Sequence, residues 1–346
     1  MQKVFVGISG GVDSAVSAAL LKDQGYDVVG VFIKIWSPEW LGCTSREDRL
    51  DAMRVAAHLS IPFREIDLTK EYKKEVVDYM IREYKIGRTP NPDVFCNKYI
   101  KFGVFFDWAL REGAEYVATG HYARIKKEGD VFQMLAGKDQ GKDQSYFLWT
   151  LGQKQLSKTF FPVGDLEKLE VRKLAKKYKL PNAQRKDSQG LCFVGPIDVK
   201  DFLAQYASQK SGDVLDGSGN VIGNHPGALF FTIGERHGFT ITEKTPNDEP
   251  YFVVAKDMEK NTIVVGHKKD SISGMKKEFA LESVNWISGT PIKGEKYTAR
   301  VRHLGVRAPC IFDSDKIIFT DPVLAASGQS LVLYDGDECL GGGIVE

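Results

Sequence analysis

The sequence has no long hydrophobic segment. No apolar run approaches the roughly 20 residues that a membrane-spanning helix needs. The first residues, MQKVFVGISGG, form a short apolar run interrupted by glycines, without the apolar core and small-residue cleavage site of a secretory signal. We therefore expect a cytoplasmic protein with no membrane partner.

Cysteines are few, and no two of them lie close together. The five cysteines are an odd number and widely spaced, and none forms a CxxC pair: Cys43, Cys96, Cys192, Cys310 and Cys339. This pattern argues against a zinc ribbon and against a disulfide scaffold. In a reducing compartment, lone cysteines are either small core residues or reactive thiols.

An excess of charge of either sign is lacking as well. Lys and Arg number 47 and Asp and Glu number 46, which leaves a formal net charge of +1. The overall charge therefore gives no reason to expect binding to nucleic acid. Any such site must come from a local basic patch.

The length of 346 residues favours two or three domains. Through residues 1–207, short apolar runs alternate with helical stretches, which predicts a doubly wound parallel sheet that binds ligands at the carboxyl ends of its strands. Glycine and turn signals then become dense, and only short strand patterns follow. We predict an α/β fold with this parallel-sheet domain (1–207), a small central β-rich domain (208–275) and a C-terminal β-barrel (276–346).

The strongest chemical signal is SGGVDS at residues 9–14, between the first predicted strand and the first predicted helix. Glycines allow close approach of the backbone to an anion, serine hydroxyls donate hydrogen bonds, and a helix N-terminus presents unpaired N–H groups. The segment is neither a Walker A loop nor GxGxxG. The alternative is an ordinary glycine turn before a helix.

The segment GRTPNPDVFCNKYIK at 87–101 contains a proline-stiffened stretch, predicted as a loop over 87–98. Cys96 follows Asp93 by three residues, just before an expected helix. The helix dipole and the nearby Lys98 and Lys101 would favour its thiolate form. The alternative for Cys96 is a small buried hydrophobic residue.

Cys192 lies in KDSQGLCF, directly after a basic stretch. Residues 171–186 hold seven Lys or Arg and no acidic residue, and such a stretch would attract phosphates, including those of RNA. Its alternative is a solvated helix face. Cys43, Cys310 and Cys339 have no comparable surroundings, and we interpret them as structural.

Five segments together resemble one protein family. SGGVDS, GRTPNPDVFCNKYIKF, ATGHYAR (118–124), GKDQSYFLW (141–149) and KDSQGLCF (186–193) occur in that order, before a terminal GGGIV. The sequence resembles the bacterial tRNA-specific 2-thiouridylases of the ATP pyrophosphatase superfamily over essentially its whole length. The resemblance implies a pyrophosphatase domain, a small central domain and a C-terminal β-barrel.

The resemblance also implies residue roles. ATP would be held by Gly7, Ile8, Ser9, Gly10, Gly11, Val12, Asp13, Ser14, Ile33 and Gly120. The target base would meet Asn91, Pro92 and Asp93, and the tRNA would meet Lys142, Asp143, Gln144, Arg302 and His303. Cys96 matches the nucleophile of the family, Cys192 the persulfide carrier, and Asp93 a proton-transfer group. Relatives usually have Arg-Tyr at 302–303, and Leu304-Gly305 also departs from their pattern.

The implied reaction uses ATP, with Mg²⁺, to adenylate O2 of the wobble uridine. Persulfide sulfur is then transferred to C2, which gives 2-thiouridine, AMP and pyrophosphate, and a transient disulfide joins Cys96 to Cys192. The implied partners are tRNAs such as those for glutamate, glutamine and lysine, and a persulfide carrier or cysteine desulfurase relay.

Three alternatives remain open. An amide-forming pyrophosphatase would share residues 9–14 without needing paired cysteines. A noncatalytic RNA-binding or redox protein would leave that loop unused. An iron–sulfur cluster on Asp93, Cys96 and Cys192 could replace the persulfide route, although three scattered ligands are a weak pattern.

Overall fold

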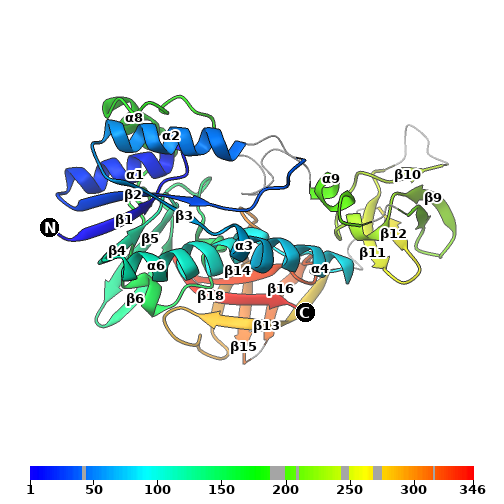
Figure 1. The fold of residues 1–346 in the computed structure, drawn as a ribbon. Helices are drawn as coiled ribbons and strands as arrows, with labels where there is room; N and C mark the ends of the chain where they lie inside the picture. The colour runs from blue at the N-terminus through cyan, green and yellow to red at the C-terminus, as the bar shows by residue number, and fades with distance from the viewer. Residues whose placement is uncertain (41–43, 188–198, 208–209, 243–248, 268–274, 315) are drawn as a thin grey trace.

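A computed structural model describes the protein over residues 1–40, 44–187, 199–207, 210–242, 249–267, 275–314 and 316–346, without the side chains of 44 and 45. Within these ranges no helix has the length and apolar character needed to cross a membrane. The ribbon has three parts, with the N-terminal sheet and its helices on one side, the β-barrel beside them, and the central domain at the far end (Figure 1).

The first part is built on a five-stranded parallel sheet in the order β3-β2-β1-β4-β7. Its strands are β1 (Lys3–Gly7), β2 (Asp27–Lys34), β3 (Phe63–Asp67), β4 (Tyr116–Ala118) and β7 (Thr159–Phe160). Val4, Phe5 and Val6 are almost fully buried because both faces of the sheet are covered. The chain leaves β1 toward β2 on one side and reaches β4 on the other, so a crevice is expected at the ends of β1 and β4.

Helices cover both faces of this sheet, and the side chains of β1 alternate between two cores. Val4 and Val6 pack with α1, α2 and α8, whereas Phe5 packs with the helices of the opposite face. The helices of this part are α1 (Val12–Asp23), α2 (Thr44–His58), α3 (Thr69–Tyr72), η1 (Lys73–Asp78), α4 (Tyr79–Lys85), α5 (Pro92–Phe95), η2 (Cys96–Val104), α6 (Phe105–Arg111), η3 (Ser145–Phe147), α7 (Gln153–Leu156) and α8 (Lys168–Lys177). The doubly wound prediction is confirmed.

The loop predicted over 87–98 is wrong in its second half. Helical structure begins at Pro92 and continues without a break through α5, the π-helix η2 and α6 to Arg111. The Asn91 side chain accepts a hydrogen bond from the Val94 N–H (3.4 Å), and proline occupies the first helical position. An Asn cap followed by Pro is a helix-start pattern, and it outweighs the general preference of Pro for loops.

The C-terminal part is a closed antiparallel barrel of six strands, in which β13 pairs with both β16 and β18. The strands are β13 (Lys276–Trp286), β14 (Lys296–Arg300), β15 (Ala308–Asp313), β16 (Lys316–Val323), β17 (Ser330–Asp335) and β18 (Glu338–Val345). A hairpin from the first part, β5 (Ala123–Glu128) and β6 (Val131–Ala136), extends this sheet through Glu338–Leu135 and Cys339–Met134 pairing. The sequence interpretation missed this hairpin.

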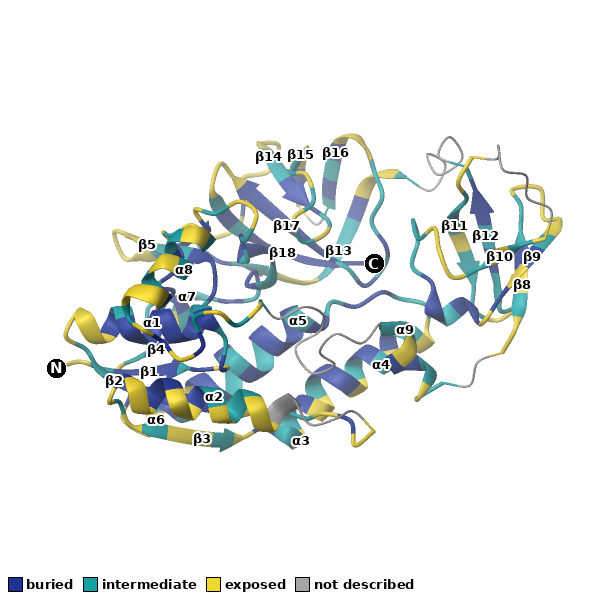
Figure 2. Ribbon diagram, turned by 90° about the horizontal axis from the view of Figure 1, so that it is seen from above, coloured by how far each residue is buried: buried dark blue, intermediate teal, exposed yellow. Residues whose placement is uncertain are grey.

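The central part is a small sheet in the order β10-β9-β8-β12-β11, in which only the β8–β12 pair is parallel. Its elements are α9 (Val199–Ala204), β8 (Gly212–Leu215), β9 (Val221–His225), η4 (Ala228–Phe230), β10 (Thr240–Ile241), β11 (Phe252–Asp257) and β12 (Thr262–Gly266). Seen from above, α4 extends from the first part toward it (Figure 2).

The three parts meet just before Pro90. The Arg88 guanidinium pairs with Glu282 of the barrel. The Thr89 N–H donates to the Ser327 carbonyl (2.8 Å), and the Thr89 hydroxyl lies 3.2 Å from the hydroxyl of Thr232 in the central part. The backbone leading into the Asn91–Cys96 turn is therefore fixed by both other parts.

Candidate active site

The SGGVDS loop lies at the carboxyl end of β1, at the N-terminus of α1. Gly10 has φ = +79°, and a Cβ there would lie 2.6 Å from the Asp48 carbonyl oxygen. Only glycine suits both this backbone conformation and this close approach. The loop is thus fixed by tertiary contacts as well as by its sequence.

The loop is also braced by its own serines. The Ser14 hydroxyl donates to the Gly11 carbonyl (3.1 Å) and accepts from the Ser9 N–H (3.2 Å). The Ser9 side chain is exposed, and its hydroxyl accepts from the Gly11 N–H (3.3 Å). Hydroxyl and N–H donors thus gather at a helix N-terminus, where the partial positive charge favours an anion such as a phosphate.

Other predicted nucleotide residues surround this loop. A Cβ on Gly120, just beyond β4, would lie 2.6 Å from the Ser14 nitrogen, so glycine is required where the two strand ends meet. The Ile33 side chain from β2 lies 3.9 Å from the Cβ position of Gly7. The fold therefore brings Gly7, Ile33 and Gly120 to the crevice between β1 and β4.

Asp13 has two partners that the sequence interpretation missed. Lys168 Nζ lies 2.7 and 2.9 Å from its two carboxylate oxygens, and the Tyr122 hydroxyl donates to it at 2.9 Å. Tyr122 lies in the ATGHYAR segment, which offered one signal. Lys168 lies 155 residues beyond Asp13, so no local pattern could have predicted the pair.

Asp187 gathers three cations beside this loop. Its carboxylate pairs with Lys142 (2.8 Å), Lys168 (2.8 Å) and Arg172 (2.5 Å). Burial opposes its ionisation, but the bonds from Lys142 and Lys168 outweigh that effect and hold the pKa of Asp187 well below its usual range. Lys142, predicted as a tRNA contact, therefore lies near the nucleotide loop.

The basic stretch 171–186 is divided between two roles. Arg172 contacts Asp187, and Arg185 pairs with Asp48 and Asp51. These guanidinium groups are engaged with the first part itself. Other cations lie exposed on α8 and just beyond it: Lys173, Lys176, Lys177 and Lys179.

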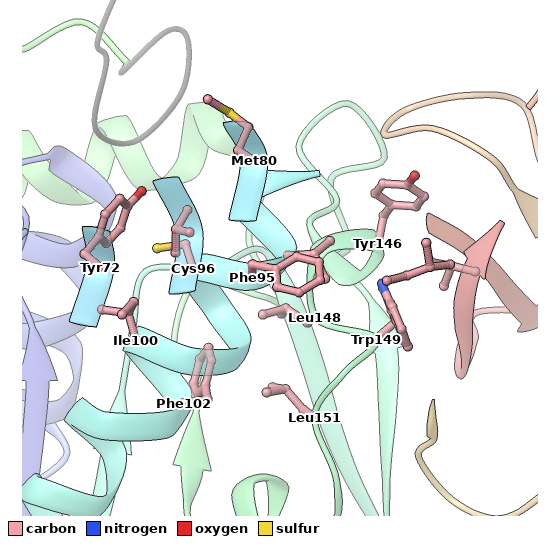
Figure 3. Close-up of a cluster of buried hydrophobic side chains, with 14 of the residues drawn as sticks. Tyr72, Met80, Phe95, Cys96, Ile100, Phe102, Tyr146, Leu148, Trp149 and Leu151 are labelled. Atoms are coloured by element: carbon pink, nitrogen blue, oxygen red, sulfur yellow. The ribbon is translucent and has the colours of Figure 1, made fainter. Parts of the chain in front are cut away.

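Cys96 is 2% exposed and begins the π-helix η2. Figure 3 shows its side chain beside Tyr72 and Ile100, while Phe95 of the same turn extends toward Leu148. The predicted polar loop position is therefore wrong for Cys96. The thiol is packed in the core, on a segment with the wider turns that recur at functional sites.

The residues around Cys96 have separate surroundings. Asp93 is half-buried in the first turn of α5, where Asn91 caps the helix. The ammonium group of Lys98 lies over the Tyr99 ring, 5.1 Å from its centroid. Cys192, like Cys43, lies outside the described residues, so the Cys96–Cys192 pairing stays a prediction.

The Cys96 helix is joined to the nucleotide crevice through His121. Lys101 Nζ lies 3.4 Å from His121 Nε2, and the Thr119 hydroxyl lies 2.7 Å from His121 Nδ1. Burial, reinforced by the Lys101 charge, lowers the pKa of His121 well below its usual value. A neutral imidazole next to Gly120 thus connects the two regions.

The predicted tRNA residues at 142–144 and 302–303 are close neighbours. Asp143 is fully buried, and it pairs with Arg300 at 2.6 Å. Arg302 is exposed, and the His303 ring lies 4.3 Å from the Phe147 ring. The loop of the first part and the end of β14 therefore form one surface, with Asp143 beneath it.

Cys310 and Cys339 agree with a structural role. Both lie in the barrel and are at least 98% buried. Burial raises the pKa of each thiol to about 12. They are therefore protonated at neutral pH and unreactive.

Metal ligands do not cluster within the described ranges: no group of three or more His, Cys, Asp or Glu side chains there could hold a metal ion. Asp13 is the carboxylate within the loop 9–14, and a carboxylate is a ligand type that Mg²⁺ accepts together with substrate phosphates. Asp13 therefore fits a Mg²⁺ ion that arrives with a nucleotide.

Comparison with known proteins covers the whole chain. Family models match residues 2–196 (tRNA methyl transferase HUP domain), 200–267 (tRNA methyl transferase PRC-barrel domain) and 276–345 (aminomethyltransferase β-barrel domain). The tRNA-specific 2-thiouridylase MnmA of Nitrosomonas europaea is 43% identical over 99% of this chain and 98% of its own length. The protein of that name from Lacticaseibacillus paracasei is 45% identical over 99% and 94%.

Likeness to solved structures is much weaker. A 4-thiouridine synthetase solved with RNA and bound ATP has 21% identity and a TM-score of 0.35, over 59% of this chain and 50% of that one. An NMN synthetase from Francisella tularensis has 16% identity and a TM-score of 0.34, over 58% and 71%.

Proposed function

The chain belongs to the tRNA-specific 2-thiouridylase family, and from this premise we propose how its own residues divide the work of an ATP-dependent tRNA sulfurtransferase. The observation that carries the proposal is the SGGVDS loop at the β1–β4 crevice, joined through His121 and Lys101 to the helix of Cys96. An ATP site and a thiol on connected elements suit activation of a base followed by sulfur transfer.

ATP binds with its phosphates at the loop 9–14 and its adenine toward Ile33. The N–H groups at the start of α1 and the exposed Ser9 hydroxyl are the donors for the phosphates. Lys168, bound between Asp13 and Asp187, is placed to compensate phosphate charge when ATP arrives. Mg²⁺, with Asp13 as its protein ligand, supplies further neutralisation of that charge.

The tRNA presents a wobble uridine that leaves its loop for the Asn91–Asp93 turn. Extrusion costs no more than a few kcal/mol, because the base is already single-stranded. Lys142, Gln144, Arg302 and His303 form the proposed surface for the rest of the anticodon region. Asp143 supports that surface from beneath by binding Arg300.

The chemistry then has two halves. Uridine O2 attacks the α-phosphate of ATP, pyrophosphate leaves, and Asp93 accepts the N3 proton. The terminal sulfur of a Cys192 persulfide bonds to C2 and AMP leaves. The Cys96 thiolate next attacks the Cys192 sulfur, which breaks the S–S bond, frees 2-thiouridine and leaves a Cys96–Cys192 disulfide. A thiol reductant and a persulfide carrier must therefore act between turnovers.

A single assay tests this function against its alternatives. The protein is incubated with ATP, Mg²⁺, a persulfide donor and bulk tRNA, and digested tRNA is examined by mass spectrometry for 2-thiouridine. We expect 2-thiouridine and tRNA-dependent AMP release. AMP release without tRNA, together with amide formation, would indicate a ligase, and the absence of 2-thiouridine would refute the proposed function.

A further inference from the structure

A cavity of about 510 Å³ lies on the outer side of the Cys96 helix. Helices η1 and α4 form one wall, the turn at Phe95–Tyr99 forms the second, and β13 and β18 of the barrel close it with Glu282 and Ile344. A volume of this order accommodates a small ligand or a single nucleotide. Neither Asp93 nor Cys96 lines it, although both belong to the helical segment that carries Phe95 and Tyr99.

Three aromatic rings stand in a row along this cavity. The rings of Tyr79 and Phe95 stack at 4.0 Å, and the ring of Tyr99 lies 5.7 Å from that of Phe95. A cation covers each end of the row: Arg82 lies 5.5 Å from the Tyr79 centroid and Lys98 lies 5.1 Å from the Tyr99 centroid. Burial raises the pKa of Tyr79, so its hydroxyl is neutral.

The acidic side chains of the cavity are already paired with other cations. Glu83 (3.2 Å) and Glu282 both contact Arg88, and Glu75 contacts Lys74 at 2.8 Å. Among the described residues, no ion pair joins a carboxylate to Arg82 or Lys98. The cavity therefore presents two cations, Arg82 and Lys98, that form no ion pair with an acidic side chain in the described part of the chain.

Cations beside aromatic rings suit single-stranded RNA, since phosphates pair with the charges and a base can stack on a partly exposed ring, here that of Tyr99 at the end of the row. Phe95, Lys98 and Tyr99 lie within four residues of Cys96 along the same helical segment, and they line the cavity whereas Cys96 does not. When the target uridine is directed to Asp93 and Cys96, the nucleotides next to it in the RNA strand would lie beside this turn. A protein surface is a poorer match, because an opening of this size admits one side chain rather than a domain.

We propose that this cavity receives a nucleotide of the tRNA anticodon loop next to the target uridine, with a phosphate between Arg82 and Lys98. The proposal rests on the proposed function only in taking tRNA as the substrate. It adds a second contact that holds the single strand while the target base occupies the site beside Asp93.

The test compares two charge-matched double variants in the full-length protein. Arg82→Ala/Lys98→Ala removes the cavity cations. Lys127→Ala/Lys158→Ala removes two exposed cations that also lie over rings, 5.7 Å from Phe132 and 6.0 Å from Tyr116, but away from the cavity. Arg82→Ala alone separates RNA binding from any effect on the Cys96 thiol, because Arg82 lies on another helix.

Binding of a hairpin RNA with an anticodon stem and loop is measured over a salt series. We expect the cavity variant to lower the salt slope by about 0.7 units, the value for one single-strand phosphate, while the control keeps the wild-type slope. Arg82→Ala should lower it by about half as much, and Tyr99→Leu should weaken binding roughly tenfold through lost stacking.

Equal binding by the two double variants would overturn the proposal. Intact RNA binding with slower sulfur uptake from a protein persulfide donor would also overturn it, because the cavity would then dock that donor. These outcomes are independent of the proposed function, which fails only if the wild-type protein forms no 2-thiouridine.

Discussion

The SGGVDS loop and the turn that carries Cys96 differ in their exposure to solvent. Ser9 is exposed at the end of β1, whereas the Cys96 side chain is 2% exposed among core residues. The Ser9 hydroxyl is therefore already accessible to a ligand, whereas the proposed reaction of Cys96 needs its turn to open. In the proposed mechanism the two halves of the reaction therefore have different structural requirements: an accessible site for activation and an opened site for sulfur release.

The cysteines should show the largest effects. Cys96→Ser and Cys192→Ser should each lose nearly all thiolation while still binding ATP and tRNA, because adenylation uses no thiol. With a labelled persulfide donor, only Cys192→Ser should fail to retain label on the protein. Cys310→Ser is the matched control, since Cys310 is a buried thiol outside this site. Full thiolation by either active-site variant would contradict the paired mechanism.

A substitution in the SGGVDS loop should block an earlier step of the reaction, the formation of AMP. Asp13→Ala should abolish AMP formation, because it removes the carboxylate that holds Lys168 at the phosphate site. The melting temperature should change by only a few degrees, because Asp13 is partly exposed and Lys168 keeps its second ion pair with Asp187. Asp23→Ala, at the other end of α1, is the control and should keep activity. Normal turnover by a folded Asp13→Ala protein would refute this role.

The difference in exposure between the two regions can be tested directly by measuring the reactivity of Cys96. Alkylation of Cys96, followed by peptide mass spectrometry, should be slow in the free protein because reaction requires local opening. Addition of tRNA with a nonhydrolysable ATP analogue should speed it roughly tenfold or more if binding opens the turn. Cys339, whose pKa is raised to about 12, should stay unmodified in both states. An unchanged rate at Cys96 would argue against opening by the substrates.

The smallest effect on tRNA binding is expected from substitutions on α8. Lys176→Ala/Lys177→Ala removes two exposed cations, and each lost phosphate contact should lower the salt slope of tRNA binding by about one unit. ATP binding should not change, because both side chains face solvent. An unchanged slope would show that this helix face is merely solvated.

Local patterns predicted one of these two regions far better than the other. The loop 9–14 could be predicted because glycines, serines and a helix start are adjacent in sequence. The burial of Cys96 could not, because Tyr72, which lies beside it, comes from a distant segment. The helix start at Asn91-Pro92 is present in the sequence as an Asn cap followed by Pro. The prediction of a loop there gave more weight to the two prolines than to this cap pattern. The pairing of Asp13 with Lys168 depends on the placement of α8, which no local signal encodes.

The β5–β6 hairpin has a consequence for any attempt to divide this protein. Because Met134 and Leu135 pair with β18, a fragment that ends before the central domain would leave β6 as an open edge strand. Such edges present unpaired N–H and C=O groups that other chains can join, so the fragment should self-associate. The barrel thus covers this edge of the N-terminal domain.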